Sequence, residues 1–216
     1  MSGFVVGLDI GFGNCKVAFG RHRGQEIVRT MPVGAGPRSD LTRGLNGEES
    51  RAGHSVLIDK TEWVAGVVPS AFENHVRVTS DSYVRSNQYK ALFYAALDEV
   101  GVTDIDYLVT GLPVAQYQEG QARIDEVRRV MEGEHYISRD KLVRVREVKV
   151  LPQPIGAYYD ALGTHKKLQH NRDIYLLVID PGFYSVDYTT VNRHGLVASN
   201  SGSSNLATSV VLDEAA

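Results

Sequence analysis

Residues 5–16 read VVGLDIGFGNCK, and residues 176–187 read LLVIDPGFYSVD. Each segment is an apolar run that ends in Asp, one further residue, Gly and Phe, followed by a short polar turn and a second strand-like stretch. Apolar runs bounded by such glycine turns predict buried β-strands that continue into hairpins. Self-similarity of this kind along one chain indicates two related halves that face each other.

The repeated turn has the chemistry of a polyphosphate site. A glycine turn lets the backbone come close to a ligand and directs N–H groups at an anion. A carboxylate at a strand end does not bind phosphate directly, but it can hold the water ligands of Mg²⁺. We therefore expect Asp9 and Asp180 to form a magnesium pair, with Lys16 supplying a positive charge for the β-phosphate. An ordinary hairpin turn in each copy is the alternative, because Asp and Gly are common in turns.

Two other phosphate-binding motifs are excluded by spacing. The sequence has no Gly-x-x-x-x-Gly-Lys-[Ser/Thr] run, so it carries no P-loop. Gly11 and Gly13 lack the third glycine of a dinucleotide-binding fingerprint, and they open a strand rather than a helix.

Four segments together resemble one superfamily. Residues 9–16 resemble the first phosphate loop of the actin, sugar-kinase and heat-shock chaperone superfamily, and residues 180–187 resemble its second. Residues 151–157 (LPQPIGA) are similar to the segment before the second loop in bacterial and archaeal actins. Residues 109–113 (VTGLP) resemble the plasmid-segregation actins of the ParM/StbA type. The resemblance covers nearly the whole chain.

The resemblance implies an α/β fold of the actin-like, ribonuclease H-like ATPase type, with a mixed sheet and flanking helices. Residues 1–163 are expected to form the first actin-like domain, with an inserted loop over 33–53. Residues 174–216 are expected to begin a second, incomplete domain. Family members continue well past the second loop, so the resemblance places the adenine pocket outside these 216 residues.

The resemblance also implies a function, namely an ATPase that polymerises into filaments and moves plasmid DNA through an adaptor protein. The residue that matches Gln153 positions the attacking water in that family. The local sequence agrees, since Pro154 favours an extended Gln153 and suits the first position of a helix. A glutamine orients water without acting as a strong base. A plain helix-capping loop is the alternative.

The expected ligands are ATP and Mg²⁺. Catalysis is assigned to Gln153 and Asp180, and Asp9 and Asp180 are expected to hold the metal through water. The nucleotide contacts are expected from the two loops and a later serine-rich segment: Asp9, Gly11, Phe12, Gly13, Asn14, Lys16, Gly182, Phe183, Tyr184, Ser185 and Gly202.

Two other functions stay open. A non-hydrolysing actin-like module is favoured by the bulky Tyr184 in a turn where small residues are usual, and by the length of the chain. Another phosphotransferase of the superfamily, such as a sugar kinase, needs a catalytic Asp near a sugar site, and no such motif is evident. Gln153 in its Pro-Gln-Pro setting favours the ATPase.

Composition limits the partners. The formal net charge of −3 gives no basic field for direct nucleic-acid binding. Cys15 is the only cysteine, so no internal disulfide forms and a reducing cytoplasm fits. The histidines lack zinc-ligand spacing, and no apolar run approaches the ~20 residues that cross a bilayer. We expect a cytoplasmic protein with no membrane contact.

Periodicity predicts the remaining elements. Helices are expected over 87–100, 121–131 and 152–162 and from about residue 205, because apolar residues there recur at helical spacing. Strands are expected over 4–10, 16–20, 26–33, 54–68 (two short strands), 106–111, 141–150, 174–179 and 196–200. Residues 33–53, rich in Gly, Arg and Ser, are expected to form a long surface loop.

Overall fold

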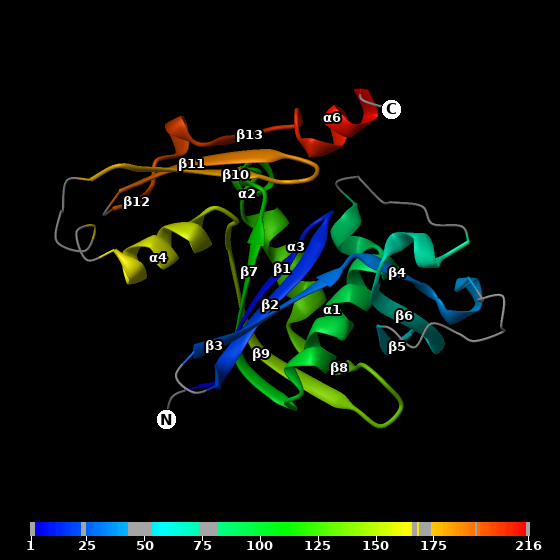
Figure 1. The fold of residues 1–216 in the computed structure, drawn as a ribbon. Coiled ribbons are helices and arrows are strands. Elements are labelled where there is room, and N and C mark those ends of the chain that lie inside the picture. Colours follow the sequence, from blue (N-terminus) through cyan, green and yellow to red (C-terminus); the bar gives the residue numbers. More distant parts are fainter. Residues whose placement is uncertain are drawn as a thin grey trace. The chain divides into compact units, whose positions relative to one another are not determined.

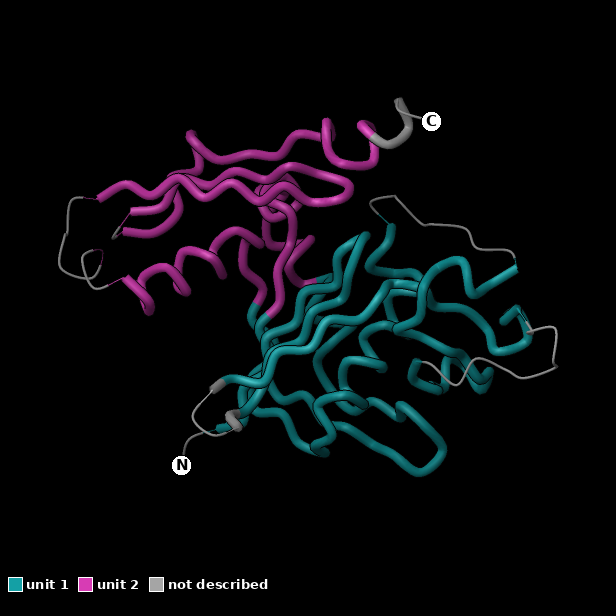
Figure 2. The backbone as a smooth tube through the Cα atoms, in the orientation of Figure 1, with its two compact units in different colours: residues 1–109, 126–149 teal, residues 110–125, 150–216 magenta. Residues whose placement is uncertain are grey.

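A computed structural model describes residues 3–22, 25–42, 53–73, 82–165, 168, 174–192 and 194–214. The chain divides into two compact units (Figure 2). Unit 1 comprises residues 1–109 and 126–149, and unit 2 comprises residues 110–125 and 150–216. The expected domain limits, 1–163 and 174–216, stay a prediction.

A six-stranded sheet has the strand order β3-β2-β1-β7-β9-β8 (Figure 1). The strands β1 and β2 and the strands β2 and β3 pair antiparallel, as the predicted hairpin requires. Side chains of β1 alternate in exposure, because successive residues of a strand point to opposite faces: Val6, Leu8 and Ile10 are buried while Val5 is exposed. The strands are β1 (Val5–Ile10), β2 (Asn14–His22), β3 (Gln25–Pro32), β7 (Asp104–Leu112), β8 (Gly133–Tyr136) and β9 (Leu142–Pro152).

Helix α1 (Asn87–Val100) is the main helix of unit 1 and has the predicted limits. The side chain of Ser86 accepts a hydrogen bond from the Tyr89 N–H at 3.1 Å, which caps the first turn. Gly101 ends the helix in the left-handed conformation at φ 75°. The helix packs against β1 and β2 and against a small second sheet.

The second sheet has the order β4-β6-β5, with β4 (Gly34–Pro37), β5 (His54–Ile58) and β6 (Thr61–Val67). The expectation of a loop over 33–53 is wrong at its start, because β4 is a buried strand. A Cβ atom at Gly34 would lie 2.4 Å from the Val67 carbonyl oxygen, and one at Gly36 would lie 2.9 Å from the Phe72 ring. These glycines therefore permit close strand packing. Arg38–Asp40 form the 3-10 helix η1 and Leu41 bridges to Phe72, whereas residues 43–52 lie outside the described residues.

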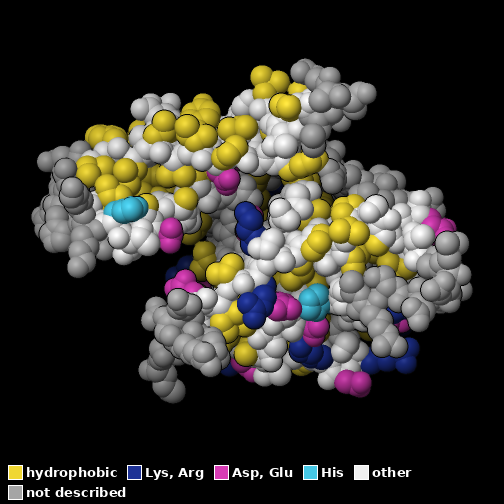
Figure 3. Space-filling model, in the orientation of Figure 1, with side chains coloured by type: hydrophobic (Ala, Val, Ile, Leu, Met, Phe, Trp, Pro, Cys, Tyr) yellow, Lys and Arg dark blue, Asp and Glu magenta, His cyan; other side chains and the backbone are white. Residues whose placement is uncertain are grey.

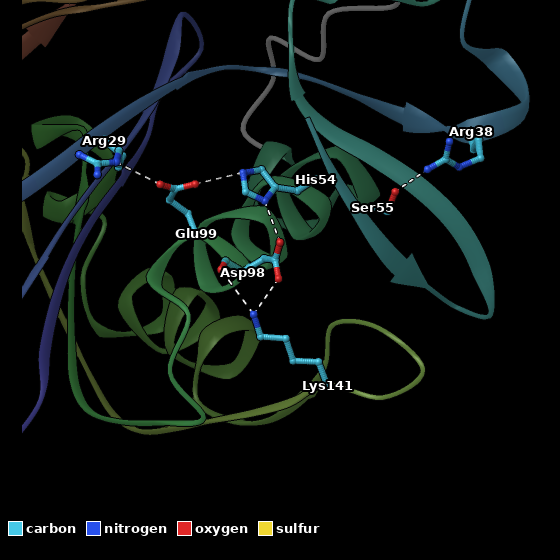
Figure 4. Close-up of polar contacts among 7 residues, drawn as sticks. All are labelled: Arg29, Arg38, His54, Ser55, Asp98, Glu99 and Lys141. Atoms are coloured by element: carbon cyan, nitrogen blue, oxygen red, sulfur yellow. Dashed lines mark hydrogen bonds and ion pairs between the residues drawn. The ribbon is translucent and has the colours of Figure 1, made fainter. Parts of the chain in front are cut away.

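A charged cluster fixes the end of α1 to its neighbours (Figure 4). His54 Nδ1 lies 2.8 Å from Asp98 Oδ2, and its Nε2 lies 3.5 Å from Glu99 Oε2. Lys141 Nζ donates to Asp98 Oδ1 at 2.7 Å, and Arg29 Nε donates to Glu99 Oε1 at 3.2 Å. Partial burial opposes ionisation of Asp98, but the hydrogen bonds from Lys141 and His54 outweigh it and lower the pKa of this carboxyl.

Short helices complete the connections of unit 1, and α3 (Gln121–Met131) has the predicted limits. This helix begins in unit 2 and ends in unit 1. The remaining short elements are the 3-10 helices η1 (Arg38–Asp40), η2 (Pro69–Ala71) and η3 (Tyr83–Arg85). In the described part of the chain, no helix has the length and apolar character to cross a membrane.

Unit 2 is built on a sheet in which β11 pairs with β10, β12 and β13. Helix α4 packs on β10 and β11, and α2 packs on β11 and β13. The elements are α2 (Val114–Gln118), α4 (Ile155–Thr164), β10 (Leu176–Pro181), β11 (Val186–Asn192), β12 (Gly195–Leu196), η4 (Ala198–Asn200), β13 (Gly202–Ser204) and α6 (Thr208–Glu214).

The expected strand over 196–200 is only partly present. It ends at Leu196, and a 3-10 turn, η4, follows. The hydroxyl of Ser201 explains the change, because it accepts from the Thr190 N–H at 3.1 Å and donates to the Val197 carbonyl at 2.9 Å. The Ser201 side chain thus makes hydrogen bonds that backbone groups would make if the strand pairing continued.

Strand β10 is less buried than its apolar sequence suggests. Leu177 and Ile179 are 61% and 59% exposed, and Tyr188, directly opposite Ile179, is 42% exposed. On the other face, Asp187, Thr189 and Val191 are buried. Hydrophobic side chains gather on the surface over β10 and β11 (Figure 3). One face of this sheet is therefore uncovered in the described part of unit 2.

Candidate nucleotide-binding hairpins

The first predicted loop is a tight hairpin in unit 1. Ile10 pairs with Cys15 and Asp9 pairs with Lys16 across the antiparallel strands. The Gly11 N–H donates to the Asn14 carbonyl at 3.0 Å and closes the turn. Gly13 lies within this turn, between the end of β1 and the start of β2.

The second predicted loop repeats this geometry in unit 2. Pro181 pairs with Val186 and Asp180 pairs with Asp187. The Gly182 N–H donates to the Ser185 carbonyl at 2.9 Å, and a Cβ atom at position 182 would lie 2.7 Å from that oxygen. Register and turn closure match the first hairpin, so the sequence repeat is also a structural repeat.

The carboxylates of Asp9 and Asp180, each the last residue but one of its strand, are both accessible. Asp9 Oδ2 lies 3.7 Å from Lys16 Nζ, with side chains 42% and 58% exposed. An exposed ion pair of this kind contributes about 0–1 kcal/mol, so Lys16 can turn toward another anion at small cost. Asp180 is exposed at the end of β10. Asp9 belongs to unit 1 and Asp180 to unit 2.

Aromatic rings support the first hairpin. The Phe12 ring stacks on the Tyr83 ring with centroids 4.7 Å apart, and Tyr83 meets Tyr89 edge to face at 5.2 Å. The Tyr83 hydroxyl lies 3.5 Å from the Gly11 carbonyl oxygen. The ring of Phe12 is thus part of the packing behind the turn, and Tyr83 is a residue that sequence reasoning missed.

Cys15 lies on β2, opposite Ile10 of the first hairpin. The side chain is fully buried, as expected for a small packed residue. Burial, and to a lesser extent the charge of Asp9, raises the pKa of the Cys15 thiol to about 12. The neutral thiol is therefore retained at physiological pH, and a nucleophilic role is disfavoured.

A buried carboxylate supports the second hairpin. Asp187 accepts hydrogen bonds from the Val114 N–H at 2.9 Å, from the Ser185 hydroxyl at 2.8 Å and from the Ser203 hydroxyl. Ser203 in turn accepts from the Ala115 N–H at 3.0 Å. Asp187 thus joins the turn, β13 and the start of α2. Ser185, expected to offer its hydroxyl to phosphate, uses it here as a donor to Asp187.

The carbonyl groups of the second turn are held by α6. The Thr208 hydroxyl donates to the Gly182 carbonyl at 3.1 Å, and the Ser209 N–H donates to the Phe183 carbonyl at 2.9 Å. Tyr184 lies in the same turn and is partly buried. Both bulky residues of the turn are therefore accommodated in a closed hairpin.

Gly202 has a different environment from the turn glycines. It lies in β13 opposite Tyr188, and a Cβ atom at position 202 would lie 2.8 Å from the Tyr188 hydroxyl oxygen. The glycine leaves room for that ring, which accounts for the residue type without a ligand. Its expected contact with nucleotide stays a prediction.

Gln153 has a firmly held backbone at the junction of β9 and α4. Its N–H donates to the Leu112 carbonyl at 2.9 Å, and its carbonyl accepts from the Gly156 N–H at 3.3 Å. Helix α4 begins at Ile155, with Pro154 as N-cap at φ −65°. Pro154 therefore precedes the first helical residue, one position earlier than expected.

Few of the supporting residues could be found from the sequence. Tyr83 lies outside any repeat and away from any turn signal, and Ser203 lies in a short strand that the pattern does not reveal. The sequence did contain a signal for Asp187, because this residue ends the second copy of the repeat. In the structure it pairs with Asp180.

Three features define an actin-like fold: the antiparallel hairpins, the strand order β3-β2-β1-β7-β9-β8 and the second strand–turn–strand repeat. Residues 7–156 match the model of the N-terminal domain of actin-like proteins, and the chain belongs to that family. The predicted fold class is confirmed.

Solved structures agree with this assignment. An archaeal actin homologue matches with TM-score 0.70 and 22% identity over 98% of this chain and 64% of that one. Its complex with ADP matches with TM-score 0.69 and 21% identity over 94% and 61%. A ParM of a 15-stranded filament from Clostridium botulinum matches with TM-score 0.67 and 16% identity over 96% and 66%. A search of curated proteins gave no match.

The chain thus spans about 64% of the length of the archaeal homologue. Relative to that structure, the second actin-like domain is incomplete in these 216 residues.

Proposed function

We propose that this chain carries the phosphate-binding part of an actin-like ATPase that binds ATP with Mg²⁺, hydrolyses it and assembles into filaments. The observation that carries the proposal is the structural repeat, in which two hairpins have the same register and turn closure and a carboxylate is the last residue but one of the first strand of each. One ordinary turn has many uses, but two matched turns in an actin-like fold favour a shared ligand.

The exposed carboxylates fit a hydrated Mg²⁺, which prefers water and one or two carboxylates as ligands. In this proposal Asp9 and Asp180 hold its water molecules, and the bound metal neutralises charge on the phosphates. Lys16 leaves its weak pairing with Asp9 and contacts a phosphate oxygen. Turn residues Phe12 to Asn14 and Phe183 to Ser185 supply backbone groups.

Gln153 is assigned to orient the attacking water. Its backbone is fixed by two hydrogen bonds, so the side chain starts from a defined point. A positioned amide that neither gains nor loses a proton contributes by placing the nucleophile.

The assembly part of the proposal rests on the family. Relatives solved as filaments include a ParM from Clostridium botulinum. By this likeness we propose self-association into filaments in the cytoplasm and a link to plasmid DNA through an adaptor protein, with no direct contact of this chain with DNA or membrane.

The test is sedimentation of the full-length gene product with ATP, ADP or no nucleotide, together with phosphate release. We expect ATP-dependent pelleting and Mg²⁺-dependent release. Gln153→Ala should slow release about a hundredfold, leave nucleotide affinity nearly unchanged and prolong the filaments. Gln121→Ala, on an exposed part of α3, is the matched control. A collapse of affinity with a normal rate of the bound complex would identify Gln153 as a structural cap.

A non-hydrolysing actin-like module is the second candidate. The specific observation in its favour concerns the Ser185 hydroxyl, which was expected to contact phosphate. This hydroxyl donates its hydrogen bond to Asp187 instead. The same assay separates the two functions, because such a module pellets or binds nucleotide without releasing phosphate.

A further inference from the structure

Gly111 lies close to Gln153 in unit 2, near the end of β7. A Cβ atom at position 111 would lie 2.7 Å from Gln153 Cγ, 3.1 Å from its Cα and 3.4 Å from its Cβ. Gly111 is not among the residues with positive φ. Backbone conformation therefore does not require glycine here, and the contact with Gln153 accounts for it.

Gln153 has little freedom to move away as a whole. Its N–H is bonded to the carbonyl of Leu112, the residue next to Gly111, and its carbonyl is bonded to Gly156 at the start of α4. A methyl group at position 111 therefore acts mainly on the Gln153 side chain, beginning at Cγ. Any residue other than glycine forces that side chain into another rotamer or shifts the β9–α4 junction.

We infer that Gly111 is a positioning residue whose missing side chain sets where the Gln153 amide lies. The inference rests on the proposed function of Gln153 for its effect on hydrolysis. The packing relationship itself is independent of that function. This packing gives a physical role to Gly111, the glycine of the segment VTGLP at 109–113.

The first test compares Gly111→Ala with a matched strand glycine in the full-length protein. Gly7 lies in β1, where a Cβ atom would meet only Ala18 at 3.9 Å, an ordinary contact. We expect Gly111→Ala to lower the turnover of bound ATP by about tenfold to a hundredfold, with nucleotide affinity nearly unchanged. Gly7→Ala should leave both turnover and affinity close to those of the parent.

A double-mutant cycle shows whether Gly111 acts through Gln153. If it does, Gly111→Ala has almost no further effect on turnover in a Gln153→Ala background, because the group it displaces is already absent. Independent losses that multiply in the double variant would overturn the inference.

Two readouts do not depend on hydrolysis. The side-chain amide NMR signals of Gln153, assigned by their loss in Gln153→Ala, should move in Gly111→Ala and stay in place in Gly7→Ala. The melting temperature of Gly111→Ala should rise when Gln153→Ala is added, because the Cγ that meets the new methyl group is removed. This stability comparison also decides the case if Gly111→Ala alone folds poorly.

The outcomes separate this inference from the proposed function. Full turnover in Gln153→Ala disproves the water-orienting role, and the amide signals and melting temperatures then decide on Gly111. Unmoved amide signals with no rescue of stability in the double variant contradict the inference even where Gln153→Ala is slow.

Discussion

The ring of Phe12, in the first hairpin turn, stacks on the ring of Tyr83 at a centroid distance of 4.7 Å and an interplanar angle of 26°. Tyr83 is buried and its hydroxyl lies near the Gly11 carbonyl. A residue 71 positions later in the chain thus holds the turn that the proposal assigns to phosphate.

Tyr83→Ala should therefore destabilise the protein and loosen the turn. We expect a loss of about 3 kcal/mol in the free energy of unfolding, because a buried aromatic ring is removed, together with weaker Mg-ATP binding. Tyr83→Phe keeps the stack and should lose less than about 1 kcal/mol. Urea unfolding and calorimetry measure both effects.

Tyr136→Ala, on a tyrosine of the same unit that is 62% exposed, is the control for the loss of a tyrosine ring. If Tyr83→Ala binds Mg-ATP as tightly as this control, the stack supports the fold but not the turn's ligand.

Asp180 provides a direct test of the magnesium proposal. Asp180→Ala removes an exposed carboxylate at the end of β10 and should abolish Mg²⁺-dependent hydrolysis in the full-length protein, while the fold persists. Asp160→Ala, another exposed carboxylate of unit 2, is the matched control. Phosphate release with and without EDTA measures the effect. Full turnover in Asp180→Ala would rule out the paired-carboxylate model.

The two hairpins could be predicted because their signals are local. An apolar run, an Asp and a glycine turn specify strand, turn and strand within about 12 residues, without reference to the rest of the chain. Helix α1 could also be predicted, since Ser86 and Gly101 mark its ends and its apolar face is continuous. The resemblance of these segments to known phosphate loops then indicated the fold.

The supports of the hairpins could not be predicted, because they depend on tertiary contacts. Tyr83 meets Phe12 only after the chain folds, and the close approach of Gly111 to Gln153 brings β7 next to the junction of β9 and α4. Glycine in a sequence is also compatible with two opposite structures, a loop and a closely packed strand. In β4 it permits close packing of a strand, although a run rich in glycine predicts a loop.

Cys15 makes stability depend on pH in a definite direction. Burial first, and the charge of Asp9 second, raise the thiol pKa to about 12, whereas an unfolded thiol has a pKa of about 8.5. The folded state retains the proton longer, so the stabilising contribution is complete below about pH 8.5 and falls as pH rises toward 12.

The contribution should fall by at most about 1.4 kcal/mol per pH unit between pH 8.5 and 9.5. Urea unfolding across that range isolates the contribution of the Cys15 thiol when Cys15→Ala, which lacks the thiol, is the reference. Iodoacetamide at pH 8 should also modify the folded protein far more slowly than the urea-unfolded one. An identical pH slope in the parent and Cys15→Ala would contradict the raised pKa.

The polypeptide of residues 1–216, expressed alone, should bind Mg-ATP weakly and associate with itself. It spans about 64% of the length of the archaeal homologue, and affinity for nucleotide depends on base and ribose contacts because phosphates and Mg²⁺ are strongly hydrated. Unit 2 exposes large apolar side chains on β10 and near α6: Leu177 at 61%, Ile179 at 59%, Leu206 at 78% and Val211 at 65%.

Apolar surface of this kind favours association, because burying it removes contact with water. Sedimentation velocity should show oligomers that become monomers when Ile179 and Leu206 are replaced by Lys and Ser. Val28→Lys is the control, because Val28 is 56% exposed on β3 in unit 1 and should leave association unchanged. Calorimetry with Mg-ATP completes the test. Micromolar binding by residues 1–216 would place the base contacts within this chain, and a monomeric parent would exclude the unit 2 surface as the site of association.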